Sequence, residues 1–170
     1  MNVQIAQRQS LFFNDFQSQT YGSLDWEKML DKLFAYVGSE PGLRYELIIG
    51  SDSMPAHSHT AEFVSAVVVH RHRSGGIYFW TKKSIGQIRT LRQRIFEEAL
   101  LSLRLAEQLI EAFKARQLSD FNLTIHVDIG PNGETKQMMH EIVGMIRGNG
   151  FEAKIKPHAY AANKVADRYV

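Results

Sequence analysis

Hydrophobic and polar positions divide the chain into a short helical region and a longer series of strands and helices. Five apolar residues recur at helical spacing and predict a helix with one apolar face: Trp26, Met29, Leu30, Leu33 and Val37. The residues before this helix are rich in Gln and Ser and show no clean period. We therefore expect residues 1–44 to form an N-terminal extension with one helix, whose aromatic side chains pack on the domain or on a partner subunit.

Residues 45–170 alternate between strand-like and helix-like patterns. Strands are predicted at about residues 46–52, 63–70, 77–81, 123–128 and 151–156. Helices are predicted at about residues 90–116, 134–147 and 160–170, the first with a Thr90–Gln93 capping box. Because a hairpin joins strands in antiparallel order and a helical crossover returns them in parallel, the βββαβαβα order predicts a mixed five-stranded α/β sheet with helices on both faces.

Composition limits the function classes. The chain has 170 residues, 44% hydrophobic and 22% charged, which suits one globular domain. The absence of cysteine excludes disulfides, thiol nucleophiles and cysteine-based zinc sites. The start lacks a secretory apolar region and no stretch approaches the roughly twenty apolar residues of a membrane span, so we expect a soluble cytoplasmic protein with no membrane partner. A net charge of +2 indicates nucleic-acid binding only if the basic residues cluster.

Acidic residues fall at informative positions. Asp52 and Asp128 each end a predicted strand, and Asp167 lies four residues after Asn163 in the last helix. Glu98 shares the buried face of the long helix, where a carboxylate is costly unless it is paired, metal-bound or protonated. Its neighbour Glu97 lies on the flank of that helix and remains a rival for the same role.

Two strand-end aspartates and two helix-borne acids suit a cluster of hard divalent cations. Carboxylate oxygens are ligands that Mg²⁺ and Mn²⁺ prefer, and two such ions about 4 Å apart activate water and stabilise the leaving oxygen of a phosphodiester. For each strand-end aspartate taken alone, the alternative is a turn residue that accepts hydrogen bonds from nearby backbone N–H groups.

These positions carry a resemblance to a known group of proteins. The matching residues are Gly50-Ser51-Asp52-Ser53, Glu98, His126-Val127-Asp128-Ile129-Gly130 and Asn163-Lys164-Val165-Ala166-Asp167. Together with the βββαβαβα order they resemble the ribonuclease-H-like superfamily, and with Lys156-Pro157 they more closely resemble its YkuK-like branch. The resemblance covers about residues 45–170, which we expect to form the ribonuclease-H-like domain.

The resemblance implies a set of roles. Asp52, Glu98, Asp128 and Asp167 would be the metal ligands of a two-metal nuclease that uses Mg²⁺ or Mn²⁺. Asn163 is similar to the first residue of the Asn-x-x-Ala-Asp pattern that opens the final helix in many ribonucleases H. His158 is similar in position to a mobile histidine that assists product release in some of them.

Basic residues cluster around the start of the long helix: Lys82, Lys83, Arg89, Arg92 and Arg94. Arginines in a first helical turn oppose the positive end of the helix dipole, and the phosphate backbone of a nucleic acid would relieve that repulsion. Ion pairs from Arg92 or Arg94 to Glu97 or Glu98 are the alternative.

The sequence leads to two hypotheses. The first is metal-dependent hydrolysis of phosphodiester bonds in RNA, DNA or a hybrid. The second is a non-catalytic nucleic-acid-binding or scaffold domain that keeps the fold, because one fold hosts several functions. Neither the substrate nor the oligomeric state follows from the sequence.

Overall fold

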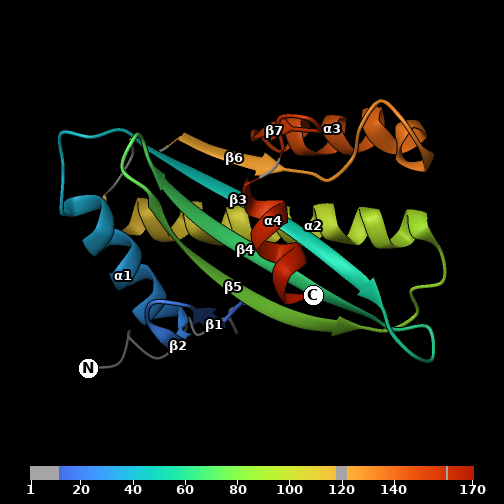
Figure 1. The fold of residues 1–170 in the computed structure, drawn as a ribbon, viewed down its shortest axis with the longest axis horizontal. Helices are drawn as coiled ribbons and strands as arrows, with labels where there is room; N and C mark the ends of the chain where they lie inside the picture. Colours follow the sequence, from blue (N-terminus) through green and yellow to red (C-terminus); the bar gives the residue numbers. More distant parts are fainter. Residues whose placement is uncertain (1–11, 118–121, 160) are drawn as a thin grey trace, which may run out of the picture.

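The computed structural model describes residues 12–117, 122–159 and 161–170. They form a mixed seven-stranded sheet in the order β2-β1-β5-β4-β3-β6-β7, with helices on its two faces (Figure 1). The strands are β1 (Asp15–Ser18), β2 (Gly22–Asp25), β3 (Tyr45–Pro55), β4 (Ala61–Arg71), β5 (Gly76–Ile85), β6 (Asn122–His126) and β7 (Glu152–Lys154). The helices are α1 (Trp26–Gly38), α2 (Leu91–Ala115), the 3₁₀ helix η1 (Glu134–Met138), α3 (Met139–Gly148) and α4 (Ala161–Tyr169).

The predicted βββαβαβα order of β3 to α4 is confirmed. β3, β4 and β5 are antiparallel neighbours, whereas β6 runs parallel to β3 and β7 parallel to β6, as helical crossovers require. The capping box of α2 is also present, with the Thr90 side chain and backbone bonded to Gln93. The helix expected at residues 134–147 begins instead as η1 before it continues as α3.

The β1–β2 hairpin is an addition that the sequence pattern did not predict. It extends the sheet because β1 pairs with β5 at Gln17 and Trp80. Phe13, Phe16 and Leu24 join the same hydrophobic cluster as the sheet and α2. The division at residues 44 and 45 into an extension and a domain stays a prediction.

The two faces of the sheet are covered unequally. Alternate residues of β3, among them Leu47 and Ile49, pack into the large core that also includes residues of α1, α2 and α3. The other face carries a small cluster of Val64, Ala66 and Ala166, where α4 crosses the strands (Figure 1).

Aromatic contacts anchor α4 on β5. The rings of Trp80 and Tyr169 stack with centroids 3.7 Å apart and an interplanar angle of 6°. The hydroxyl oxygens of Tyr78 and Tyr169 lie 3.0 Å apart, and the Tyr78 hydroxyl also lies 2.7 Å from Gln19 Oε1. The C-terminal helix is therefore fixed on the sheet by contacts that reach the turn between β1 and β2.

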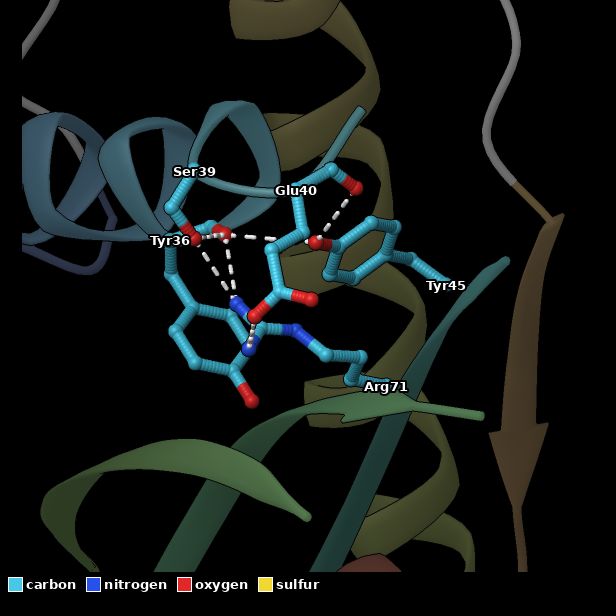
Figure 2. A network of polar contacts seen from close by, with 5 residues as sticks. All are labelled: Tyr36, Ser39, Glu40, Tyr45 and Arg71. Carbon is cyan, nitrogen blue, oxygen red and sulfur yellow. Dashed lines mark hydrogen bonds and ion pairs between the residues drawn. The ribbon is translucent and has the colours of Figure 1, made fainter. Parts of the chain in front are cut away.

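A buried arginine joins α1 to the sheet at the end remote from Pro55 (Figure 2). Arg71 is 8% exposed, and its guanidinium lies 4.1 Å from the ring centroid of Tyr36 and 5.5 Å from that of Tyr45. It pairs with Glu40 at 2.6 Å and donates to Ser39 Oγ at 2.8 Å and to the Tyr36 carbonyl at 3.1 Å. Because α1 has no basic residue in its last turn, Arg71 supplies the positive charge that its C-terminus favours.

The Arg71→Met variant is expected to lower the free energy of unfolding by about 1–3 kcal/mol, because it loses cation–π contacts and charge-assisted hydrogen bonds. Urea unfolding followed by circular dichroism measures the change. Arg44→Met is the control, since Arg44 is exposed and only its backbone carbonyl bonds to this region. Equal loss in both variants would contradict a specific role for the Arg71 network.

Candidate active site

The site lies where β3 and β6 separate. Their parallel pairing ends at Gly50 and His126, while β3 continues beside β4 as far as Pro55. Asp52 therefore lies inside β3, paired with Val64, and not at a strand end as expected. The antiparallel ladder with β4 carries the strand past the end of its apolar run.

Asp128 follows two residues after β6 and is held from two sides. Its Oδ1 atom pairs with Lys156 Nζ at 2.8 Å. Its backbone N–H lies 3.1 Å from the Asn163 side chain, whose amide is oriented so that the oxygen accepts from Asp128 and the nitrogen donates to the His126 carbonyl at 3.3 Å. Asn163 thus continues the hydrogen-bond pattern of the sheet where β6 has ended.

Close packing brings α4 to this point. A Cβ atom at Gly50 would lie 2.6 Å from the terminal amide of Asn163 and 2.9 Å from Ala162 Cβ. Gly50 therefore faces α4, and Asp52, two residues along the same strand, faces the same side. Asp167 is exposed on α4, four residues after Asn163.

Glu98 reaches the site from α2 and is 3% exposed. The Ser53 hydroxyl donates to Glu98 Oε1, and Arg94 Nη1 donates to the Ser53 carbonyl at 2.6 Å and to Ser53 Oγ at 3.3 Å. Glu97 is only half-buried, whereas Glu98 is buried and bonded to β3.

The charges of neighbouring acids act on Asp52 and on Glu98. Burial raises the pKa of Asp52, a hydrogen bond from the Ser53 N–H lowers it, and the charges of Asp167 and Asp128 raise it further. Burial raises the pKa of Glu98 to about 8; the Ser53 hydrogen bond opposes this, and the charge of Asp52 adds to it. A repulsion of this kind among carboxylates is typical of functional sites, although structural acids can produce it too.

The donor set fits a divalent cation in chemistry and charge. Carboxylate oxygens are hard ligands, and a cation would offset the burial and the repulsion that together raise the pKa of Asp52 and Glu98. Within residues 12–117, 122–159 and 161–170, however, no group of three His, Asp or Glu side chains is arranged to hold a metal ion. Glu98 is bonded to Ser53 through one oxygen and Asp128 is paired with Lys156, so the Asp128 carboxylate must leave its lysine before it can hold an ion.

The five basic residues proposed for nucleic-acid binding do not form one surface. Lys82 is exposed on β5 in the same cross-strand row as Asp52, because Val64 pairs with both. Lys83 points to the opposite face, with its Nζ 4.2 Å from the ring centroid of Phe12.

The arginines of this group are also dispersed. Arg92 pairs with Glu141 of α3 at 2.5 Å, and Arg94 bonds to Ser53. Arg89 is exposed in the loop before α2. His158 lines a pocket beside β7 with Ala153, Lys154 and Ile155.

Sequence reasoning missed three residues of the site: Gly50, Ser53 and Lys156. Gly50 and Ser53 flank Asp52 in the motif, and Lys156 precedes Pro157, so each stood in the quoted pattern without an assigned role. Only the packing of α2, α4 and the loop after β7 shows what each one contacts.

Glu98 predicts a dependence of stability on pH. Between its ordinary pKa of 4.5 and the folded value of about 8, the native state holds a proton that the unfolded chain has lost. The free energy of unfolding should therefore fall as pH rises through this range, by on the order of a few kcal/mol. We expect Glu98→Gln to remove this fall, as measured by thermal unfolding at pH 5 and pH 8 without metal.

The pH profile of Glu98→Gln must be compared with that of wild type, because His126 also contributes to the pH dependence of stability. Burial lowers the pKa of His126 to about 4. That residue makes stability rise with pH between about 4 and its ordinary 6.5, opposite to the effect of Glu98. Glu97→Gln is the matched control and should keep the wild-type profile. A Glu98→Gln profile identical to wild type would show that Glu98 is not buried as described.

Comparisons with known proteins agree with this architecture. A family model described as Ribonuclease H-like matches residues 28–170. The uncharacterized protein YkuK of Bacillus subtilis (strain 168) is 29% identical, and the match covers 94% of this chain and 96% of that protein. No solved structure matches the chain significantly. Among the described residues, none of the helices has the length and apolar character needed to cross a membrane. The expected cytoplasmic location stays a prediction.

Proposed function

The chain belongs to the ribonuclease H-like family, and from that premise we propose that it is a divalent-metal-dependent nuclease acting on a nucleic acid. The observation that supports this most is that like charges act on two of these acids where β3 and β6 separate: those of Asp128 and Asp167 act on Asp52, and those of Asp52 and Asp128 act on Glu98. The Glu98 carboxyl is buried beside like charges, which destabilises the fold and makes a structural purpose alone a poor explanation.

Each acid has a place in the proposal. Asp52, Asp128, Glu98 from α2 and Asp167 from α4 would hold the cations. Bound Mg²⁺ or Mn²⁺ would supply an activated water and stabilisation of the leaving oxygen.

The surrounding residues prepare these positions. The Asn163 side chain accepts a hydrogen bond from the Asp128 N–H and so joins this backbone to α4. Asp167 lies on the same helix, so the segments that carry Asp128 and Asp167 are linked. Lys156 neutralises Asp128 in the absence of metal and must release this carboxylate when a cation takes its place.

One observation favours a second candidate function. A lysine amine already lies 2.8 Å from the Asp128 carboxylate, as expected if a basic residue has replaced the metal. The protein would then be a nucleic-acid-binding or scaffold domain without catalysis. The exposed fractions of the two side chains, 58% for Lys156 and 37% for Asp128, favour exchange instead, because ion pairs at such exposed sites are weak.

A cleavage panel separates the two candidates. End-labelled RNA–DNA hybrid, single-stranded RNA, single-stranded DNA and branched DNA are each incubated with protein and Mg²⁺, Mn²⁺ or EDTA. The nuclease proposal expects cleavage of at least one substrate with a metal and none with EDTA. Binding without cleavage of any substrate would favour the scaffold.

Lys82 is expected to contact a phosphate of the bound strand. Lys82 on β5 and Asp52 on β3 lie in the same cross-strand row, with Val64 of β4 between them. The backbones of Lys82 and Asp52 are therefore about 10 Å apart. Among the described residues Lys82 makes no ion pair. Lys82→Gln should weaken binding of a labelled oligonucleotide in EDTA and reduce the slope of log K against log salt by about 1.

Lys32→Gln is the control for Lys82, because Lys32 lies on α1 at the opposite face of the sheet and loses the same charge. Fluorescence anisotropy measures the oligonucleotide affinity of both variants at salt concentrations between about 50 and 200 mM. Equal slopes for the two variants would contradict a contact between Lys82 and phosphate.

A further inference from the structure

A chain of hydrogen bonds links α2, β3 and Glu98. Arg94 lies one helical turn before Glu98 on α2, yet its guanidinium bonds to Ser53 of β3 and not to that carboxylate. Ser53 is 6% exposed and faces α2, on the side of β3 opposite to Asp52. The serine hydroxyl is therefore the contact between Glu98 and the strand that carries Asp52.

The chemistry of the three groups gives this chain a direction. A guanidinium has only donors, so Ser53 Oγ accepts from Arg94 Nη1. The hydroxyl proton is then directed to Glu98 Oε1, which accepts it. Arg94 also donates to the Ser53 carbonyl at 2.6 Å, which ties the end of β3 to the first turns of α2.

We propose that Ser53 and Arg94 are positioning residues that orient the Glu98 carboxylate for a divalent cation. The hydroxyl satisfies one carboxylate oxygen and leaves the second oxygen to the ion. The proposal rests on the proposed function, because it assigns Glu98 the part of a metal ligand. Partners that orient metal ligands in this way commonly contribute 10–100-fold to metal affinity or activity.

The hydrogen bonds of Ser51 provide an internal comparison. Ser51 lies two residues before Ser53, on the same face of β3 and equally buried. Its hydroxyl lies 2.8 Å from Ser65 Oγ and 2.9 Å from Ser102 Oγ, so these two hydrogen bonds join it to other serines and not to the Glu98 carboxylate. Ser51 and Ser53 are therefore two buried serines of one strand, and of the two hydroxyls it is that of Ser53 that bonds to Glu98.

The test is Mn²⁺ binding by isothermal titration calorimetry at pH 8 with the full chain. Ser53→Ala should weaken Mn²⁺ binding by about 10–100-fold, whereas Ser53→Thr keeps the hydroxyl and should stay near wild type. Arg94→Gln should weaken binding in the same direction, and Ser51→Ala should leave it unchanged. Thermal unfolding without metal checks that each variant is folded.

Unchanged Mn²⁺ affinity in Ser53→Ala would overturn the proposal. Tighter binding would overturn it as well, since Ser53 would then hold Glu98 away from the ion. If Ser53→Ala weakens Mn²⁺ binding but wild type cuts no substrate, the positioning role stands and the nuclease proposal fails. If wild type cuts its substrate and Ser53→Ala binds Mn²⁺ normally, only the positioning role fails. If wild type binds no Mn²⁺, both fail.

Discussion

The Asp52→Asn protein is expected to cut its substrate at least about 100-fold more slowly than wild type with Mn²⁺, because asparagine keeps the shape of the side chain but removes its charge. Asp52 is chosen for this test because the charges of Asp128, Asp167 and Arg94 all act on the pKa of its carboxyl group. Initial rates at saturating substrate, measured on the substrate that the cleavage panel identifies, give the change.

Stability distinguishes loss of chemistry from loss of fold in this variant. Because burial and neighbouring acids raise the pKa of Asp52, its negative charge is unfavourable in the metal-free fold. Asp52→Asn should therefore unfold at the same or a slightly higher temperature than wild type without metal. Asp31→Asn is the control, because Asp31 is 65% exposed on α1 and pairs with Arg116. An undiminished rate in Asp52→Asn would remove the basis of the mechanism.

The Gly50→Ala protein is expected to lose about 1–3 kcal/mol of unfolding free energy, as overpacked cores do, together with most of its activity. The new methyl group would meet the Asn163 amide at 2.6 Å, Ala162 at 2.9 Å and the His126 carbonyl at 3.2 Å. Two of these neighbours belong to α4, so the helix must shift, and it carries Asp167. Activity should therefore fall by more than the loss of folded protein explains.

Gly144→Ala is the matched control for Gly50→Ala. Gly144 lies inside α3, and a Cβ atom there meets nothing within 4 Å. Alanine in a helix interior is favoured over glycine by roughly 0.5–1 kcal/mol, so this variant should be as stable as wild type or more stable. Urea unfolding and the rate of substrate cleavage, measured for both variants, give the contrast. A Gly50→Ala protein with wild-type stability would show that α4 does not pack closely on β3.

Local periodicity predicted the elements whose apolar faces meet the large core. β3, β4 and β5 were predicted from apolar runs of strand length, and the helical spacing around Glu98 reports which side of α2 is buried. The same spacing predicted that Glu98 points inward, and its 3% exposure agrees with this. Such patterns lie within one element, so a single sequence contains them.

Contacts between distant elements could not be predicted in this way. β1 and β2 have four residues each, too few for a period, and become strands by pairing with each other and with β5. β3 continues beyond Asp52 because β4 remains beside it. The basic residues near α2 looked like one cluster in sequence, but Lys82 and Lys83 are adjacent in a strand and point to opposite faces.

The most direct test of the central claim is the anomalous scattering of Mn²⁺ in crystals grown and soaked at pH 8. We predict manganese bound at about 2 Å from the Asp52 carboxylate and shared with Asp128 or Glu98. The Lys156 amine should then have left Asp128. Crystals that hold no manganese at Asp52, with Lys156 still paired to Asp128, would contradict a metal-dependent function for these four acids.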